Sequence, residues 1–388
     1  MKGIAEKQLN LITKRIMECN PANDSLFGGE LAKSLFFYYR YETSGEEQYA
    51  DLAVEKLRFV LEAFNNNEAR LMGPYYCNGI SGLLYILILY IKKELIADTL
   101  KEDIALLANQ LLETALLGIE EDFNDFAHGS FGVLFCLIQY AELCNDADGL
   151  NIILRKIEDK YLKTEKPWIP SYIANHDEKL KINFSLAHGQ TGFLVLLMQA
   201  YRLAGITPEI KILLKRNVDF VLGFKKKSPI DNTFNYFPST WHTETGEFKT
   251  SGRLAWCYGD FGPLFMLYEA AAFFGEPTYQ AIADELGIKT TSRLGIDDTM
   301  LESSQICHGT GGVAIMYKKL AGISNLQKYM DASGFWMDKT ISFLEKELQL
   351  EIQETKVTDV VEGITGMGLV LMSYISEKPL DWGRMILI

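Results

Sequence analysis

The chain has 388 residues, of which 48% are hydrophobic and 23% are charged, and its formal net charge is −13. This composition supports a large packed core and excludes an intrinsically disordered chain. The acidic balance argues against non-specific nucleic-acid binding, because phosphate groups require a basic protein surface.

One pattern recurs along the chain: a glycine, two residues, a second glycine, and an apolar stretch with helical spacing. In chain order the copies read LFGGELAKSLFF, YCNGISGLLYIL, DFAHGSFGVLFCL, SLAHGQTGFLVLL, WCYGDFGPLFML, ICHGTGGVAIMY and VVEGITGMGLVL, the first with Ala32 in place of the second glycine. The first glycines follow one another at intervals of 50 to 70 residues. A period near fifty without a strand signal predicts a repeat of helical hairpins.

The stretches between the glycine motifs predict the outer helix of each hairpin. Residues 46–64 and 207–222 carry apolar residues three and four apart, as amphipathic helices do. We therefore expect an all-α fold in which seven helical pairs close into one α/α toroid over residues 1–388, because closure buries both ends of the array. The motif glycines are expected to adopt unusual backbone angles before each helix, or to let neighbouring helices approach closely.

Two segments between motifs exceed the period. Residues 163–183 and 224–251 are rich in Pro, Asn, Thr, Ser and aromatic residues, which indicates long loops. They include His176 and His242, for which surface exposure is the default expectation. Long loops on a rigid scaffold often bind substrate or cover a site, so a lid is one hypothesis and an ordinary surface loop is the other.

The sequence contains no candidate membrane span or secretory signal. The longest apolar run, residues 82–91, is far shorter than the roughly 20 residues needed to cross a bilayer, and the N-terminus lacks an uninterrupted apolar stretch. Six cysteines are scattered along the chain, which favours thiols or metal ligands over disulfides. We therefore expect a cytoplasmic protein.

Polar residues gather at one repeat position. The residue before each first glycine reads Gly28, Asn78, His128, His188, Tyr258, His308 and Glu362, and one residue earlier come Cys257 and Cys307. In a closed ring these positions converge on one mouth. Two Cys and one His are preferred zinc ligands, and three of them leave a fourth tetrahedral position open, as in catalytic sites. The alternative for Cys257, Cys307 and His308 is two buried free thiols beside a capping histidine.

Such a zinc site could bind a substrate thiol at its open fourth position. A free Cys has a pKa of about 8.5, and coordination to zinc deprotonates the thiol to a nucleophile. On the same rim, His188 can donate a proton at neutral pH, and Tyr258 can donate a hydrogen bond. Arg253 with Asp125 can hold a carbonyl or stabilise an enolate. Taken singly, these four residues are more often structural or surface groups, and His128 has no independent role.

The motifs WCYG (256–259), CHG (307–309) and AHG (187–189), the sevenfold glycine repeat and the ending PLDWGRMILI resemble the lanthionine synthetase C family over the whole chain. Members of that family are α/α toroids with one zinc ion held by two Cys and one His. They close thioether rings by adding a peptide Cys to a dehydroalanine or dehydrobutyrine that a dehydratase made earlier.

The resemblance implies zinc on Cys257, Cys307 and His308, with His188, Arg253, Tyr258 and Asp125 as the active-site residues. His188 would protonate the enolate that forms in a Michael-type addition. A dehydrated precursor peptide would be the substrate, with a dehydratase, and an exporter at the membrane, as further partners. The chain departs from the family at His128, where a Glu is frequent, and at Phe261, where a Pro is common.

Three other functions remain open from the sequence. A relative of this type could bind zinc and a small thiol such as glutathione without closing rings. A glycosidase would need two facing carboxylates, for which Asp125 with Glu362 or Asp359 are candidates. A purely structural zinc is disfavoured because it normally has four protein ligands.

Overall fold

The computed structural model describes residues 1–171, 180–226 and 234–388. Within them, one buried helix follows each glycine motif: α2 (Glu30–Ser44), α4 (Ile80–Lys92), α6 (Ser130–Cys144), α8 (Gln190–Ala204), α10 (Phe261–Phe274), α13 (Thr310–Ser324) and α16 (Ile364–Ile375). These inner helices are apolar nearly all round. In α4, for example, every residue from Ser81 to Ile91 is buried. The predicted all-α class is confirmed.

Each inner helix packs against an outer helix. The outer helices are α1 (Lys2–Glu18), α3 (Glu47–Asn65), α5 (Lys101–Glu120), α7 (Asp148–Ile157), α9 (Pro208–Gly223), α11 (Pro277–Thr290) and α14 (Gln327–Glu347). The predicted amphipathic segments 46–64 and 207–222 are therefore α3 and α9. Six outer helices follow their inner partner along the chain, but α1 packs against α16, so the seventh pair joins the two ends of the chain.

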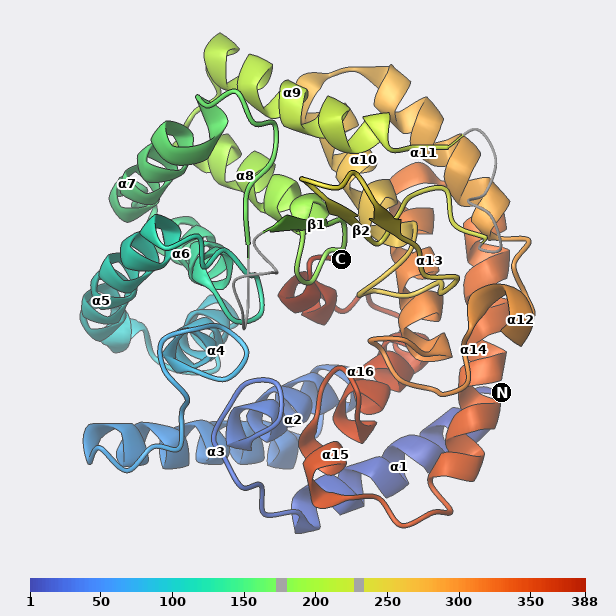
Figure 1. Ribbon diagram of the computed structural model, residues 1–388. Coiled ribbons are helices and arrows are strands. Elements are labelled where there is room, and N and C mark those ends of the chain that lie inside the picture. The colour runs from blue at the N-terminus through green and yellow to red at the C-terminus, as the bar shows by residue number, and fades with distance from the viewer. Residues whose placement is uncertain (172–179, 227–233) are drawn as a thin grey trace.

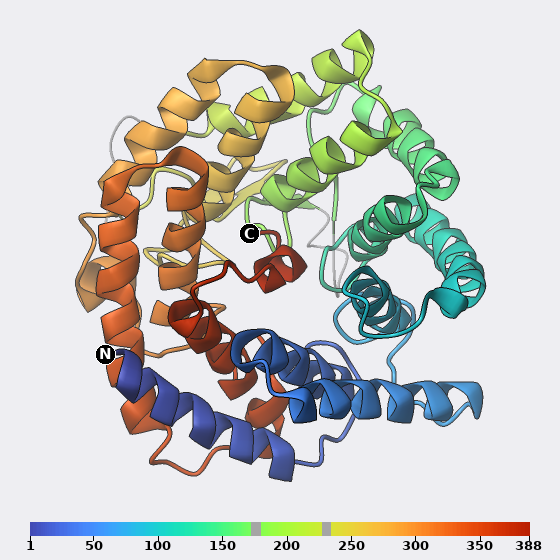
Figure 2. The ribbon, with the colours of Figure 1, turned by 180° about the vertical axis from the view of Figure 1, so that it is seen from behind.

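The inner helices form a closed ring. Each contacts the next in the order α2, α4, α6, α8, α10, α13 and α16, and α16 returns to contact α2. Figure 1 and, from behind, Figure 2 show this toroid, with the C-terminus at its centre. Because closure needs both α1 and α16, we infer that residues 1–388 form one domain.

Short elements connect or fill the ring. They are η1 (Asp98–Leu100), η2 (Glu158–Leu162), α12 (Ile296–Thr299), α15 (Glu354–Thr358) and η4 (Trp382–Ile386). The last of these, η4, lies in the middle of the ring in both views (Figures 1 and 2). In the described part of the chain, no helix is long and apolar enough to cross a membrane.

The prediction of two long loops was incomplete. Their ends form a small antiparallel sheet in the order β1 (Lys181–Asn183), β2 (Thr240–His242), β3 (Phe248–Lys249), with Ile182 opposite Trp241 and Trp241 opposite Phe248. Packing explains the pairing, because the Trp241 ring contacts Trp168, Phe220 and Phe224. His242 therefore lies on a strand and is half-buried, whereas His176 lies outside the described residues.

The motif glycines act through close approach rather than through unusual angles. A Cβ atom at Gly132, Gly192, Gly312 or Gly366 would overlap the carbonyl oxygen six residues earlier. The chain thus folds back under the first turn of these four inner helices, α6, α8, α13 and α16. The expected unusual backbone angles were wrong for most copies: Gly129, for example, has an extended φ of −142°. Among the first glycines only Gly259 has a positive φ, of +97°.

Substituting one such glycine tests the tight turn. In Gly312→Ala the new Cβ would overlap the Ile306 carbonyl, so we expect the free energy of unfolding to fall by about 1–3 kcal/mol. The matched control is Gly322→Ala in the same helix, where no heavy atom lies within 4 Å. That variant should be neutral, or more stable by about 0.5–1 kcal/mol. Urea unfolding of the metal-free proteins measures both, and equal stabilities would contradict the close-approach argument.

Candidate metal centre

The turns before the inner helices meet at one end of the ring, where backbone hydrogen bonds join neighbouring turns. The bonds, with their N···O distances, run from Phe27 to Cys77 (3.2 Å), Cys77 to Ala127 (2.9 Å), Trp256 to Cys307 (3.2 Å), Cys307 to Val361 (2.8 Å) and Val360 to Phe27 (3.0 Å). Equivalent repeat positions, far apart in sequence, are therefore held side by side. The convergence on one mouth that the repeat register predicts is observed.

A cavity of about 440 Å³ opens where these turns meet. Its walls include His128, His188, Cys307, Asp359 and Glu362, which come from four different turns. The cavity therefore brings acidic, imidazole and thiol groups to one space in front of the helix ends.

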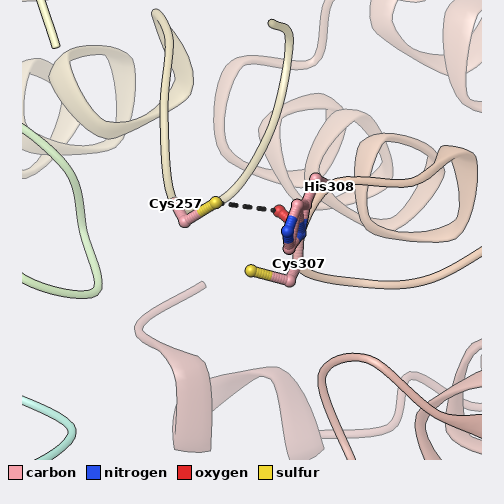
Figure 3. A group of neighbouring side chains, drawn as sticks. All are labelled: Cys257, Cys307 and His308. Atoms are coloured by element: carbon pink, nitrogen blue, oxygen red, sulfur yellow. Dashed lines mark hydrogen bonds between the residues drawn. The ribbon is translucent and has the colours of Figure 1, made fainter. Parts of the chain in front are cut away.

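Cys257, Cys307 and His308 form a cluster beside this cavity. One potential ligand atom from each residue lies within 4.8 Å of the others. Figure 3 shows the two sulfur atoms on facing loops with the His308 ring next to them. Zinc binds sulfur at about 2.3 Å and nitrogen at about 2.0 Å, so ligands of one ion stand roughly 3.5–4 Å apart. The cluster fits such an ion with small adjustments.

The two thiols of the cluster differ in acidity. The Cys257 thiol donates to the Cys307 carbonyl at 3.5 Å, and Cys257 is only 5% exposed. Hydrogen bonding between the two thiols lowers the pKa of Cys257 against the effect of burial, and the charges of His188 and Arg253 lower it further. The same hydrogen bond and burial raise the pKa of Cys307. Cys257 is therefore the more acidic thiol of the pair, and an incoming cation would favour loss of the protons of both thiols.

His308 is held as a neutral ring. Burial lowers its pKa, and the nearby charges of Arg253 and Lys356 add to that effect against the opposing Glu362. The Nε2 atom lies 3.6 Å from one oxygen of the Glu362 carboxylate. The other oxygen of that carboxylate binds Lys356 Nζ at 2.6 Å. The buried Nδ1 atom has no hydrogen-bond partner among the described residues. A neutral imidazole with one nitrogen beside a carboxylate and the other free is typical of a metal ligand.

His188 and Asp125 form the second feature of the site. His188 Nδ1 lies 2.7 Å from Asp125 Oδ2, and Asp125 is fully buried. The other Asp125 oxygen accepts from the His128 backbone N–H at 2.7 Å. Burial alone would lower the pKa of His188, but the charge and hydrogen bond of Asp125, with the charge of Cys257, raise it. The His128 ring stacks on His188, with centroids 6.4 Å apart, and burial lowers the pKa of His128.

Arg253 and Tyr258 lie on the loop that carries Cys257. Arg253 is close enough for its charge to lower the pKa of Cys257 and His308, and its buried Nε has no partner within the described ranges. The Asn235 side-chain amide donates a hydrogen bond to the Arg253 carbonyl at 3.2 Å, and its oxygen accepts one from the Arg293 guanidinium at 2.6 Å. Tyr258 is 37% exposed, which places its phenol on the rim rather than in the core.

Sequence reasoning missed two contacts here. Glu362 was considered only as a glycosidase acid. It occupies the same repeat position as His308, one copy later, so the repeat made it a candidate neighbour of that histidine. The part of the 224–251 segment around Asn235 was considered a lid or surface loop, yet it supports the backbone of Arg253. Cys77 occupies the same repeat position as Cys257 and Cys307 and lines the cavity, but it is not part of the metal-binding cluster found among the described residues.

Comparison with known proteins agrees with the toroid fold. The chain resembles nisin cyclase in structure, with 18% sequence identity, a TM-score of 0.76, and coverage of 99% of this chain and 96% of that one. An unsaturated glucuronyl hydrolase from Bacillus sp. GL1 is more distant, with 14% identity, 97% coverage of both chains and a TM-score of 0.49. No curated protein matches the sequence. The family model of lanthionine synthetase C-like proteins matches residues 20–387, and the chain therefore belongs to that family.

Proposed function

We propose that this protein is a zinc-dependent cyclase that forms lanthionine and methyllanthionine rings in a dehydrated precursor peptide. The observation that carries the proposal is the cluster of Cys257, Cys307 and His308 beside a cavity that is also lined by His188, whose ring is paired with the buried Asp125. The family and the likeness to nisin cyclase support the same function. The ring acceptors would be dehydroalanine and dehydrobutyrine residues, so a dehydratase must act first, and an exporter could act afterwards.

The ligand set suits catalysis better than a structural role. Three protein ligands leave a fourth tetrahedral position for the substrate, whereas structural zinc sites are closed by four. Zinc, when bound, would supply a substrate thiol in its nucleophilic thiolate form at neutral pH. Glu362 would orient the His308 ring for this task, and the buried surroundings of Cys257 would exclude competing water.

The remaining residues would manage the proton and the developing charge. The Asp125 carboxylate can only accept, so His188 Nδ1 carries the hydrogen between them and Nε2 is left to serve the substrate. Attack of the thiolate on the β-carbon creates an enolate, which the Arg253 guanidinium stabilises and Tyr258 assists by hydrogen bonding. Protonated His188 then donates to the α-carbon, and its raised pKa keeps the proton available.

The three carboxylates that the sequence offered for a glycosidase are all engaged by other groups of the described residues. Asp125 is occupied by His188 and a backbone N–H, and Glu362 is occupied by Lys356 and His308. Asp359 accepts the backbone N–H groups of Val361 and Glu362 at 2.9 and 2.7 Å. A glycosidase acid and base must instead face the sugar from opposite sides.

Metal content provides the first test. We expect about one zinc ion per chain in the purified protein, and loss of that ion in Cys257→Ala and Cys307→Ala, because each substitution removes one of three ligands. Cys144→Ala is the matched control, since Cys144 is a free thiol at the end of α6 outside the cluster. Elemental analysis after dialysis measures the content. A Cys257/Cys307 double variant that retained full zinc would contradict the ligand assignment.

Ring formation distinguishes the cyclase from a zinc protein that only binds small thiols. Zinc-loaded protein, incubated with a dehydrated Cys-containing peptide, should consume the free peptide thiol without changing the peptide mass. Alkylation followed by mass spectrometry measures the loss, and Cys307→Ala should abolish it. If a cognate peptide kept its thiols while the protein bound glutathione, the thiol-binding function would replace the proposal.

The pH dependence tests the role of His188. Its imidazolium form donates the proton, so the cyclisation rate should fall as pH rises through its pKa, which Asp125 holds above the ordinary value. Asp125→Asn removes that charge, so the falling limb should shift to lower pH. His188→Ala should retain zinc but slow cyclisation by about 100-fold. Unchanged rates in His188→Ala, or an unmoved limb in Asp125→Asn, would remove the pair from the proton-transfer role.

A further inference from the structure

The C-terminal segment, residues 381–388, crosses the middle of the ring (Figures 1 and 2). Side-chain contacts fix it to four inner helices. Tyr39 and Lys93 bind Asp381 at 2.9 and 2.8 Å, the Trp382 indole N–H donates to Ser373 at 2.7 Å, and Arg384 pairs with Glu142 at 3.0 Å. Trp382, Met385 and Ile386 are at most 1% exposed. The segment is thus a rigid brace anchored to α2, α4, α6 and α16.

From this anchorage the segment reaches the turns that carry the thiols. The Trp256 indole N–H donates to the Ile386 carbonyl at 2.8 Å, and the Tyr76 hydroxyl donates to the Met385 carbonyl at 3.2 Å. Both donors stand three residues before a first glycine. The other copies have side chains without a hydrogen-bond donor at that position: Leu26, Phe126, Leu186, Ile306 and Val360. The two departures from the repeat therefore coincide with the two contacts to the segment.

Trp256 joins the brace to the turns that carry Cys257 and Cys307. Its backbone N–H donates to the Cys307 carbonyl at 3.2 Å, and the following residue is Cys257, whose thiol contacts the same carbonyl at 3.5 Å. The indole thus links the Trp256 side chain to the C-terminal segment, and the Trp256 backbone links the same residue to Cys307. Any shift of Ile386 would be transmitted to the distance between the two sulfur atoms.

We propose that the C-terminal segment sets the geometry of the metal site, with Trp256 as the positioning residue that links them. The inference rests on the proposed zinc binding. A tetrahedral site tolerates small changes in ligand spacing poorly, and loss of outer contacts that orient ligands typically weakens metal affinity by 10–100-fold. Tyr76, by contrast, lies on the turn of Cys77, which is not in the cluster, so its bond to Met385 holds the segment without touching a ligand turn.

A matched pair of variants tests this. Trp256→Phe removes one donor to the segment from a ligand turn, and Tyr76→Phe removes the other from a turn without a ligand. Competition with a chromogenic chelator measures zinc affinity, and chemical unfolding measures stability. We expect zinc to bind about 10-fold more weakly in Trp256→Phe and within about twofold of the unsubstituted protein in Tyr76→Phe. Equal affinities in the two variants, whether both reduced or both unchanged, would overturn the proposal.

A truncation and a metal-free measurement complete the test. Deleting Leu387 and Ile388 removes the bond from the Ile388 N–H to Gly383 that closes the segment, and should weaken zinc binding without any change near the thiols. In metal-free protein, alkylation of Cys257, mapped by mass spectrometry, should be severalfold faster in Trp256→Phe than in Tyr76→Phe. Equal alkylation rates would count against the brace. If the unsubstituted protein bound no zinc, the proposed function would fail, while the alkylation rates would still decide the positioning role.

Discussion

In five of the seven copies the second glycine closely approaches the carbonyl six residues earlier, including the copy that carries Cys307 and His308, and the turns around the site depend on this contact. It lets the chain turn under the first turn of an inner helix, and residues just before several of these helices line the cavity. A side chain at Gly312 or Gly366 would push the turn outward and separate it from its neighbours. The backbone hydrogen bonds from Trp256 to Cys307 and from Cys307 to Val361 would then lose their geometry. Helix packing and metal-site geometry therefore share one origin.

Much of this arrangement could be predicted because it follows from a repeat. Once the glycines were aligned, Cys257 and Cys307 occupied one register position and His188 and His308 occupied the next, and a closed ring brings equal positions together. The closure itself involves α1 and α16, which lie at opposite ends of the sequence. Periodicity predicted that the ring closes, but the pairing of these two helices depends on which faces meet in space.

Other features could not be predicted because they break the repeat. The β1–β2–β3 sheet depends on the contacts of Trp241 with Phe220 and Trp168, which come from separate segments. Strands of two or three residues are too short to show an alternating sequence pattern. Glu362 next to His308 depends on the spacing between neighbouring turns, which register alone does not supply. The C-terminal segment has no counterpart in the repeat. Its contact with Trp256 therefore could not be predicted from the repeat, although the sequence of the segment resembled that of the family.

The hydrogen bonds within the turns explain why Asp125, and not another carboxylate, contacts the imidazole of the proposed acid His188. Four residues before the first glycine stand Asp125, Ser185 and Asp359, and each accepts the backbone N–H three residues ahead through one side-chain oxygen. The hydroxyl of Ser185 has no second oxygen, and the second oxygen of Asp359 lies 3.9 Å from Lys356. Only Asp125 directs its free oxygen at a neighbouring imidazole. A residue that stabilises the turn thus also orients His188.

The Asp125–His188 contact differs from the backbone hydrogen bonds that join several other neighbouring turns. Backbone hydrogen bonds join the turns of Phe27, Cys77 and Ala127, and those of Trp256, Cys307 and Val361, whereas a side-chain bond joins the turns of His128 and His188. A backbone bond fixes its turn, but an imidazole can gain or lose a proton while its turn stays in place. The candidate metal-binding thiols Cys257 and Cys307 therefore lie on turns that are joined by backbone hydrogen bonds, whereas the proposed proton donor, His188, is linked to its neighbouring turn through its side chain.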